Sequence, residues 1–431
     1  MSKPTFFISC PVDTYSGYGA RSRDIVKAII ELDKYNVQIV PQRWGNTPWG
    51  FLKDNPKWEF LTKYIYTQPQ LQQQPDIWMQ ITVPNEFQRV GKYNIGCTAG
   101  METTLVDATW VEGMNRMDIN LVSSEHSKKA FLSSVYNQQD QQGNVVGQIK
   151  IEKPLEVLFE GADLETYFPD NSPCTIDFDI PESFAYLFVG HWMQGQIGED
   201  RKNVGLLIKA FYETFKNKKN KPALILKTSQ VGTSYIDRDT ILKKIQHIKS
   251  TVNSTNLPNV YLLHGEFTDE EMNSIYNHSK VKAMVSLTKG EGFGRPLLEF
   301  SLTQKPIIAT NWSGHIDFLN SEFTTLLPGT LKNVDPSAVV EKMILKESQW
   351  FSVDHGHVGH YLKDMFENYK TYQSKAKRQA HYSKTNFSFD KMKEVLDGYL
   401  TTNIPEFPKQ VKLELPKLKK IELPKIKKVN G

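Results

Sequence analysis

Two carboxylates stand eight positions apart in the segment KGEGFGRPLLEF, residues 289–300. Glu291 lies among glycines, whereas Glu299 follows a proline at position 296. Proline favours the first turn of a helix, where its missing N–H breaks no hydrogen bond. The segment therefore predicts a loop around Glu291 that leads into a helix, with Glu299 in or next to the first turn of that helix.

Such a loop is suited to binding a diphosphate. Glycines let the backbone approach a ligand closely, and a helix N-terminus offers unpaired N–H groups with a partial positive charge. Glu299 could then accept hydrogen bonds from the two hydroxyls of a ribose, and Glu291 could engage a sugar beyond the phosphates. In the structural alternative, Glu299 only complements the helix dipole and the glycines form a turn. The segment is not a dinucleotide fingerprint, because that motif belongs in the first βα turn of its domain.

A second candidate cluster follows a predicted strand that ends at Gly190. Arg201 and Lys202 open a predicted amphipathic helix, where cations oppose the helix dipole at a cost of roughly a few tenths of a kcal/mol. A phosphate bound nearby would remove this cost, and an exposed basic pair is the alternative. Lys227 ends another predicted strand and is expected at the same rim.

The first half of the chain offers a third candidate, the segment SGYGARS after its first predicted strand. Gly17 and Gly19 could form a tight loop that reaches toward the leaving phosphate. A plain strand-to-helix turn is the alternative.

The elements that must position these residues alternate between strands and helices, as in parallel βαβ units. The expected strands are residues 5–10, 37–42, 77–82, 93–99, 119–124 and 155–160, then 184–190, 223–229, 260–267, 283–288, 306–311 and 324–329. Helical periodicity is found at residues 20–32, 125–135, 204–217 and 268–279. After Gly329 the chain is expected to be mostly helical to about Thr402. Two doubly wound α/β domains imply a cleft at the carboxyl ends of their strands.

Composition limits the class of protein. A length of 431 residues suggests two domains, and 39% hydrophobic with 23% charged residues is typical of a globular chain. Cys10, Cys97 and Cys174 fit no metal-ligand or disulfide spacing, which favours thiols in a reducing compartment. No run approaches the ~18 apolar residues of a membrane span, and the N-terminal apolar run is too short for a signal peptide. We therefore expect a cytoplasmic protein.

The positive charge is concentrated in the tail from Lys409 to Gly431. This tail carries eight lysines and two glutamates, or +6, so the other residues sum to about −2 (4 − 6). It contains two copies of an eight-residue pattern, LELPKLKK and IELPKIKK. It could be a solvated tail, or a contact surface for an acidic partner such as nucleic acid or anionic lipid.

Taken together, these motifs resemble the retaining glycosyltransferases of family 4, which have the GT-B fold of two Rossmann-like domains. The resemblance runs from about residue 5 to 400. GEGFGRPLLE is similar to the E-x7-E element of the family, and DRKNVGLLIKAF to its basic phosphate-binding segment. LFEGADLETYFP resembles its domain junction, KPIIATNWSGHIDFL the strand and loop after the E-x7-E helix, and SGYGARS stands at its N-terminal glycine loop. A segment that begins TAGMETT resembles a subgroup with acidic residues before its fifth strand.

The resemblance implies transfer of a glycosyl group from a nucleotide-diphosphate sugar with retention at the anomeric carbon, without a metal or other cofactor. It implies that Glu291 orients the donor sugar and Glu299 holds the ribose. Arg201 and Lys202 would stabilise the departing diphosphate. The further positions expected to bind the donor are Gly17, Gly19, His191, Lys227, Gly292, Phe293, Gly294 and Arg295.

Two positions depart from the family. Many members have an arginine where this chain has His191, so the phosphate role would rest on Arg201 and Lys202, or on His191 when protonated. Many members also have a histidine in the N-terminal domain that faces the cleft. Glu102 is the nearest polar candidate here, and we count it with the catalytic residues.

The resemblance also implies a division of the chain. We expect an acceptor-binding domain at residues 1–170, a nucleotide-sugar-binding domain at 171–385, a helix at 386–408 that crosses back to the first domain, and the basic tail at 409–431. The acceptor could be a saccharide, a lipid-linked group or a protein. A phage-type enzyme that glycosylates DNA bases is an alternative that the tail favours, although the base would have to be flipped out of the duplex. A non-catalytic protein that binds nucleotide-sugars is the second alternative.

Overall fold

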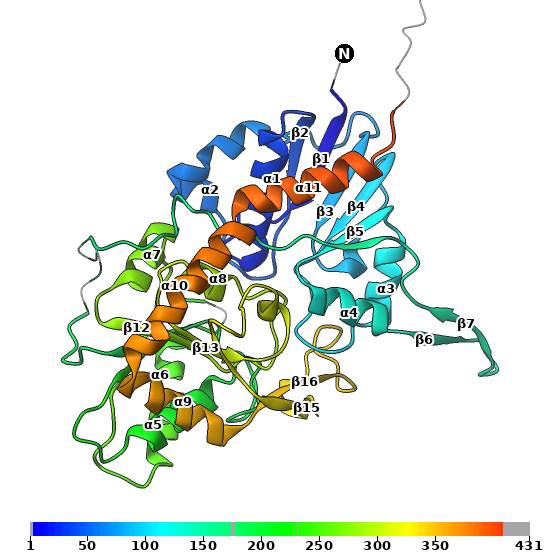
Figure 1. The fold of residues 1–431 in the computed structure, drawn as a ribbon. Coiled ribbons are helices and arrows are strands. Elements are labelled where there is room, and N and C mark those ends of the chain that lie inside the picture. Colours follow the sequence, from blue (N-terminus) through cyan, green and yellow to red (C-terminus); the bar gives the residue numbers. More distant parts are fainter. Residues whose placement is uncertain (1–2, 173, 175, 177, 231, 408–431) are drawn as a thin grey trace, which may run out of the picture.

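The structure is a computed structural model that describes residues 3–172, 174, 176, 178–230 and 232–407. The predicted basic tail, residues 409–431, lies outside the described residues. Two domains, each built on a six-stranded parallel sheet with helices around it, make up the described chain (Figure 1). The expected α/β class and the two Rossmann-like domains are thus confirmed.

The N-terminal sheet has the strand order β2-β1-β3-β4-β5-β8, and all its neighbouring strands are parallel. Its strands are β1 (Thr5–Cys10), β2 (Asn36–Pro41), β3 (Ile77–Ile81), β4 (Tyr93–Cys97), β5 (Ile119–Val122) and β8 (Leu155–Val157). Between them lie α1 (Gly17–Glu31), α2 (Phe51–Asp54), α3 (Ala108–Asn115), α4 (Glu125–Ser133) and the 3₁₀ helices η1 (Pro56–Tyr64) and η2 (Pro84–Glu86). A hairpin of β6 (Tyr136–Gln139) and β7 (Val145–Ile149) projects from this domain (Figure 1).

The C-terminal sheet has the order β11-β10-β9-β12-β13-β14 and is also parallel. Its strands are β9 (Ala185–Val189), β10 (Ala223–Lys227), β11 (Val260–Leu263), β12 (Val281–Ser286), β13 (Ile307–Thr310) and β14 (Thr325–Leu327). Its helices are α5 (Val204–Phe215), α6 (Tyr235–Ser250), α7 (Asp269–Asn277), α8 (Arg295–Ser301), η3 (Gly314–Asp317) and η4 (Pro336–Ala338). Strand order reverses between β9 and β12, so the segments that follow these two strands meet at the switch point where such folds bind ligands.

The expectation of a mostly helical chain after Gly329 is wrong for its first part. β15 (Gly329–Asn333) and β16 (Gln349–Val353) form an antiparallel hairpin. Trp350 is fully buried in a small separate core beneath it. The sequence of β16 is only five residues long, and its apolar residues are too few to separate a strand from a helix by periodicity.

Three helices complete the described part of the chain: α9 (His355–Glu367), α10 (Tyr369–Asn386) and α11 (Phe389–Asn403). α10 packs on α8 of the C-terminal domain, whereas α11 lies beside α1 of the N-terminal domain (Figure 1). Leu396 and Leu400 of α11 belong to the same core as Phe6 of β1. The last helix therefore buries its apolar face on the first domain. No helix of the described chain is long and apolar enough to cross a membrane, and the three cysteines, all in its described part, are free thiols.

Candidate functional site

Glu291 lies in the loop between β12 and α8 and is held firmly by its backbone. Its N–H donates to Ser313 Oγ at 2.9 Å, and its carbonyl accepts from the N–H of Gly314, also at 2.9 Å. Ser313 and Gly314 follow β13, the neighbouring strand. The loops after two adjacent parallel strands thus fix the position of this carboxylate, which is only 7% exposed.

Two cations face the carboxylate of Glu291. Lys202 Nζ donates to Glu291 Oε1. Arg201 Nη1 lies 3.5 Å from Glu291 Oε2 and 3.2 Å from the carbonyl oxygen of Gly290. Burial alone would raise the pKa of Glu291, but the charges of Lys202 and Arg201 lower the pKa to about 2. Burial lowers the pKa of Lys202, although Glu291 opposes this shift. Glu291 is therefore ionised and forms an ion pair with each of the two cations.

Arg201 and Lys202 lie in the turn before α5 rather than in its first turn, because α5 begins at Val204. Asp200 Oδ2 accepts the N–H of Val204 at 3.1 Å and complements the helix dipole there. Asp200 therefore offsets the dipole at this end of α5, so the position of the two cations alone does not indicate a phosphate. The stronger indication of an anion site is that two cations lie together at the carboxyl end of the sheet, where they meet the carboxylates of Glu291 and Glu102.

The N-terminal domain contributes Glu102, whose Oε1 lies 3.5 Å from Arg201 Nη1. The two domains also touch through backbone atoms. A Cβ at Gly290 would lie 1.8 Å from the carbonyl oxygen of Glu102, and one at Gly292 would lie 2.4 Å from that of Ala99. Both glycines therefore leave room for the backbone of the other domain, and their role in admitting a ligand stays a prediction.

Glu299 lies in the second turn of α8, which begins at Arg295 and has Pro296 as its second residue. Its Oε1 accepts from Arg295 Nε at 2.8 Å and its Oε2 from the hydroxyl of Tyr276 at 3.3 Å. Burial raises the pKa of Glu299 to about 7, although Arg295 opposes this shift. The ribose hydroxyls expected here would therefore meet a carboxylate that two side chains already orient.

Arg295, expected among the donor-binding residues, spans the domain interface. Its Nη1 lies 2.5 Å from Asp24 Oδ2 of α1 and 3.9 Å from Glu160 Oε2. Burial raises the pKa of both Asp24 and Glu160, while Arg295 acts in the opposite direction on each. One guanidinium thus joins α1 of the first domain to Glu299 of the second.

His191 and Lys227 follow β9 and end β10, and they face the same rim as Arg201 and Lys202. His191 Nδ1 lies 3.1 Å from Ser229 Oγ. Desolvation of the ring, followed by the charges of Lys202 and Lys227, lowers the pKa of His191 to about 4. His191 is therefore neutral at pH 7, and the positive charge of this rim comes from the lysines and the arginine. Burial also lowers the pKa of Lys227.

The remaining predicted positions differ in what surrounds them. Gly17 is the exposed first residue of α1. Gly19 is required by packing, because a Cβ there would lie 2.4 Å from the carbonyl oxygen of Thr14. Gly294 has a φ of 98° that suits glycine. Phe293 is buried in the hydrophobic core against Phe318, with ring centroids 4.9 Å apart, so its side chain does not face the polar site.

Sequence reasoning missed two histidines, of which His315 lies near Glu291 and helps to lower the pKa of that carboxyl group. His315 of η3 is fully buried; its Nε2 donates to the carbonyl oxygen of Thr310 at 2.7 Å, and its Nδ1 has no hydrogen-bond partner among the described residues. His126 of α4 packs against Trp312 with ring centroids 4.5 Å apart, and its Nε2 likewise has no described partner. Mainly through burial, the pKa of His126 is lowered to about 4. A histidine at the start of a helix after a buried strand was the only signal for His126.

The C-terminal half carries a recognisable domain. Residues 186–345 match the family model described as glycosyl transferases group 1. This match includes Arg201, Lys202, Lys227, Glu291 and Glu299, and it excludes Glu102. No curated protein matches the chain.

Solved structures extend the comparison to the whole chain. One is a glycosyltransferase from Rickettsia africae ESF-5, with 13% identity, a TM-score of 0.56 and coverage of 93% of this chain and 99% of that chain. A second is Anabaena Alr3699/HepE in complex with UDP and glucose, with 11% identity, a TM-score of 0.57 and coverage of 92% and 99%. A third is sucrose-phosphate synthase from Thermosynechococcus elongatus, with 12% identity, a TM-score of 0.57 and coverage of 93% and 98%.

At these identities the likeness shows the fold, which is GT-B as predicted. Together with the matched domain, it confirms the prediction of an enzyme that transfers sugars.

Proposed function

We propose that the protein is a retaining, family 4 glycosyltransferase that takes a sugar from a nucleotide-diphosphate sugar and transfers it to a hydroxyl acceptor. The observation that carries this proposal is the buried Glu291 carboxylate, which lies against Lys202 and Arg201 at the switch point of the C-terminal sheet. Fixed positive charges stabilise the negative charge of the departing diphosphate, and a fixed carboxylate accepts hydrogen bonds from the sugar hydroxyls. The complex of Alr3699/HepE with UDP and glucose supports a nucleotide-sugar donor.

The proposed roles follow from the charges. In the transition state, positive charge develops on the sugar as the bond to the diphosphate breaks. Arg201 and Lys202 stabilise the diphosphate oxygens, and because they are fixed they supply the positive charge without a metal. Glu291, ionised at neutral pH, accepts hydrogen bonds from the donor sugar. Glu299 accepts those of the ribose, so that Glu291 and Glu299 are the two acids of an E-x7-E element.

The two domains close on the donor in this proposal. Glu102 of the N-terminal domain contacts Arg201 directly, at 3.5 Å, which brings the acceptor side next to the diphosphate side. Closure excludes water and so limits hydrolysis of the donor. The free thiols are consistent with the cytoplasm as the place of action.

The direct test replaces Glu291. We expect Glu291→Ala to abolish sugar transfer from UDP- and GDP-sugars, measured by release of the nucleoside diphosphate and by mass spectrometry of the products. Glu322→Ala, at an exposed position in the same domain, is the matched control and should retain activity. Near-wild-type turnover by Glu291→Ala would refute the assignment.

A DNA acceptor is the second candidate, and the formal charge of +6 on residues 409–431 is the observation that favours it. Lysines that contact phosphates give affinity that is independent of sequence and falls steeply with salt. A gel shift of duplex DNA, with the full chain and with the chain ending at residue 408, at two salt concentrations, tests this. Equal binding by both chains, or none, would exclude a role of the tail in holding DNA.

A further inference from the structure

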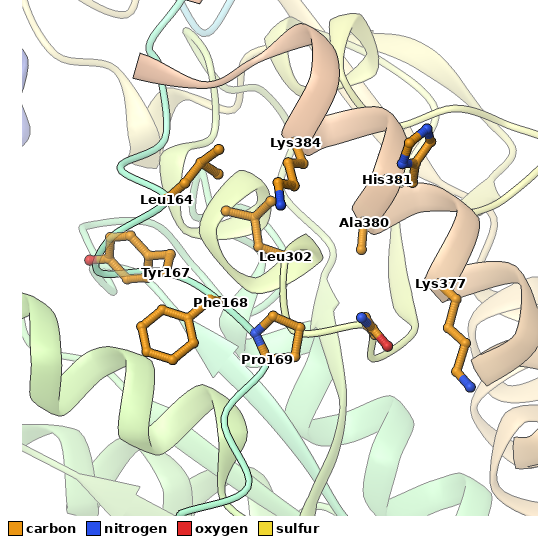
Figure 2. Close-up of a pocket in the computed structure, with 10 residues that line it drawn as sticks. Leu164, Tyr167, Phe168, Pro169, Leu302, Lys377, Ala380, His381 and Lys384 are labelled. Carbon is orange, nitrogen blue, oxygen red and sulfur yellow. The ribbon is translucent and has the colours of Figure 1, made fainter. Parts of the chain in front are cut away.

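A cavity away from the candidate site lies between the segment after β8, the end of α8 and the helix α10 (Figure 2). Its volume is ≈ 210 Å³. Its lining residues do not include Glu291, Arg201 or Lys202, although one of them, Tyr167, lies beside Tyr276, which donates to Glu299. Ligand pockets for drug-sized molecules span about 300–1,000 Å³, so a guest of this cavity is smaller than a nucleotide-sugar.

One wall of the cavity is basic. Lys377, His381 and Lys384 of α10 line it, and their i, i+4 and i+7 spacing places them on one face of the helix. No acidic residue lines the cavity. α10 as a whole contains five lysines and arginines and no aspartate or glutamate. Within the described chain neither Lys377 nor Lys384 forms an ion pair.

The other side of the cavity is apolar. Leu164, Phe168 and Pro169 come from the segment after β8, and Leu302 follows α8 (Figure 2). Leu302 is buried, whereas Phe168 remains 42% exposed although it is a large apolar side chain. A large apolar side chain on the rim of a cavity offers a surface for the ring or alkyl part of a small molecule.

We propose that this cavity binds a small phosphate monoester with a ring or alkyl portion. Lys377 and Lys384 give this wall two positive charges, which complement the double negative charge of a phosphate monoester. The apolar side accommodates the rest of the ligand. Inorganic phosphate alone would use only half of the cavity, and an uncharged ring only the other half.

Calorimetric titration of the full chain with phenyl phosphate tests the proposal. Lys377→Gln/Lys384→Gln removes the two charges and keeps the chain length. The matched control is Lys370→Gln/Lys375→Gln, which removes two exposed lysines of the same helix that do not line the cavity. We expect at least a tenfold weaker binding of phenyl phosphate by the first variant and an unchanged affinity of the second. Lys202→Ala should also leave the affinity unchanged, which separates this cavity from the candidate active site.

Three results would overturn the proposal. The first is equal weakening by the two double variants, which would mean that only the net charge of α10 matters. The second is loss of binding in Lys202→Ala, which would place the phenyl phosphate at the candidate active site. The third is inorganic phosphate binding as tightly as phenyl phosphate, which would exclude a contribution of the apolar side. Circular dichroism of each variant confirms that it is folded before its affinity is interpreted.

Discussion

The contact of Asp24 with Arg295 should couple the two domains energetically. Asp24 is 6% exposed, its Oδ2 lies 2.5 Å from Arg295 Nη1, and the residues are 271 positions apart in the sequence. We expect Asp24→Asn to lower the free energy of unfolding, because Asn keeps the shape of the side chain and removes its charge.

The expected magnitude follows from what Arg295 retains. Removing one partner of an isolated buried ion pair costs about 3–5 kcal/mol. Arg295 keeps Glu299 at 2.8 Å and Glu160 at 3.9 Å, so its charge is still compensated. The loss therefore approaches that of one charge-assisted hydrogen bond, about 1.5–3 kcal/mol.

Urea unfolding of the wild type, Asp24→Asn, Arg295→Gln and the double variant forms a double-mutant cycle that measures this coupling. Asp33→Asn is the control, because its partner Lys3 is at the surface and an exposed pair contributes about 0–1 kcal/mol. If the coupling is below about 0.5 kcal/mol, or if Asp24→Asn behaves as Asp33→Asn does, the reasoning is refuted.

Three further predictions concern the candidate site. Lys202→Ala should weaken the binding of UDP or GDP by at least about 1.5 kcal/mol, and unchanged affinity in calorimetry would contradict its role. The folded protein raises the pKa of Glu299 from 4.5 to about 7, so the folded state holds this proton more tightly and the free energy of unfolding should fall as pH rises from about 4.5 to 7. Glu299→Gln should remove that fall. Urea unfolding at about pH 5 and pH 8 measures it, and the same pH dependence in the variant and the wild type would show that the idea is wrong. Gly290→Ala should lower both activity and the thermal midpoint of unfolding, because its Cβ would lie 1.8 Å from the carbonyl oxygen of Glu102. Gly398→Ala is the control, because its Cβ would meet open space. Equal behaviour of the two variants would contradict a closed interface between the domains.

Much of the fold could be predicted because its signals are local. Every expected strand of the two sheets is present, with ends within a few residues, since short apolar runs between turn residues need only neighbouring residues to be recognised. The β15–β16 hairpin was missed because it has no such local signal. Its strands pair across a loop of fifteen residues, and the burial of Trp350 depends on packing that no local pattern contains.

The candidate site likewise has features that the sequence predicted and contacts that only the structure shows. The spacing of Glu291 and Glu299 predicted a loop and a helix, and the structure has both. The roles of these residues in binding a donor remain predictions. Gly292 and Arg295 were expected to face the donor, yet the first leaves room for Ala99 and the second pairs with Asp24. Both partners belong to the other domain, so no reading of the loop alone would find them.

The sequence by itself determined the order of strands and helices, the division into two α/β domains, and the types of charged residues at the ends of the strands. Only the tertiary structure decided which charges meet. Glu291 is 89 positions from Lys202, and their contact lowers the pKa of that carboxyl group, while burial raises the pKa of Glu299 eight positions later. Periodicity is a property of neighbouring residues, whereas electrostatic energy depends on the distance between charges and on their burial, which only the folded chain sets.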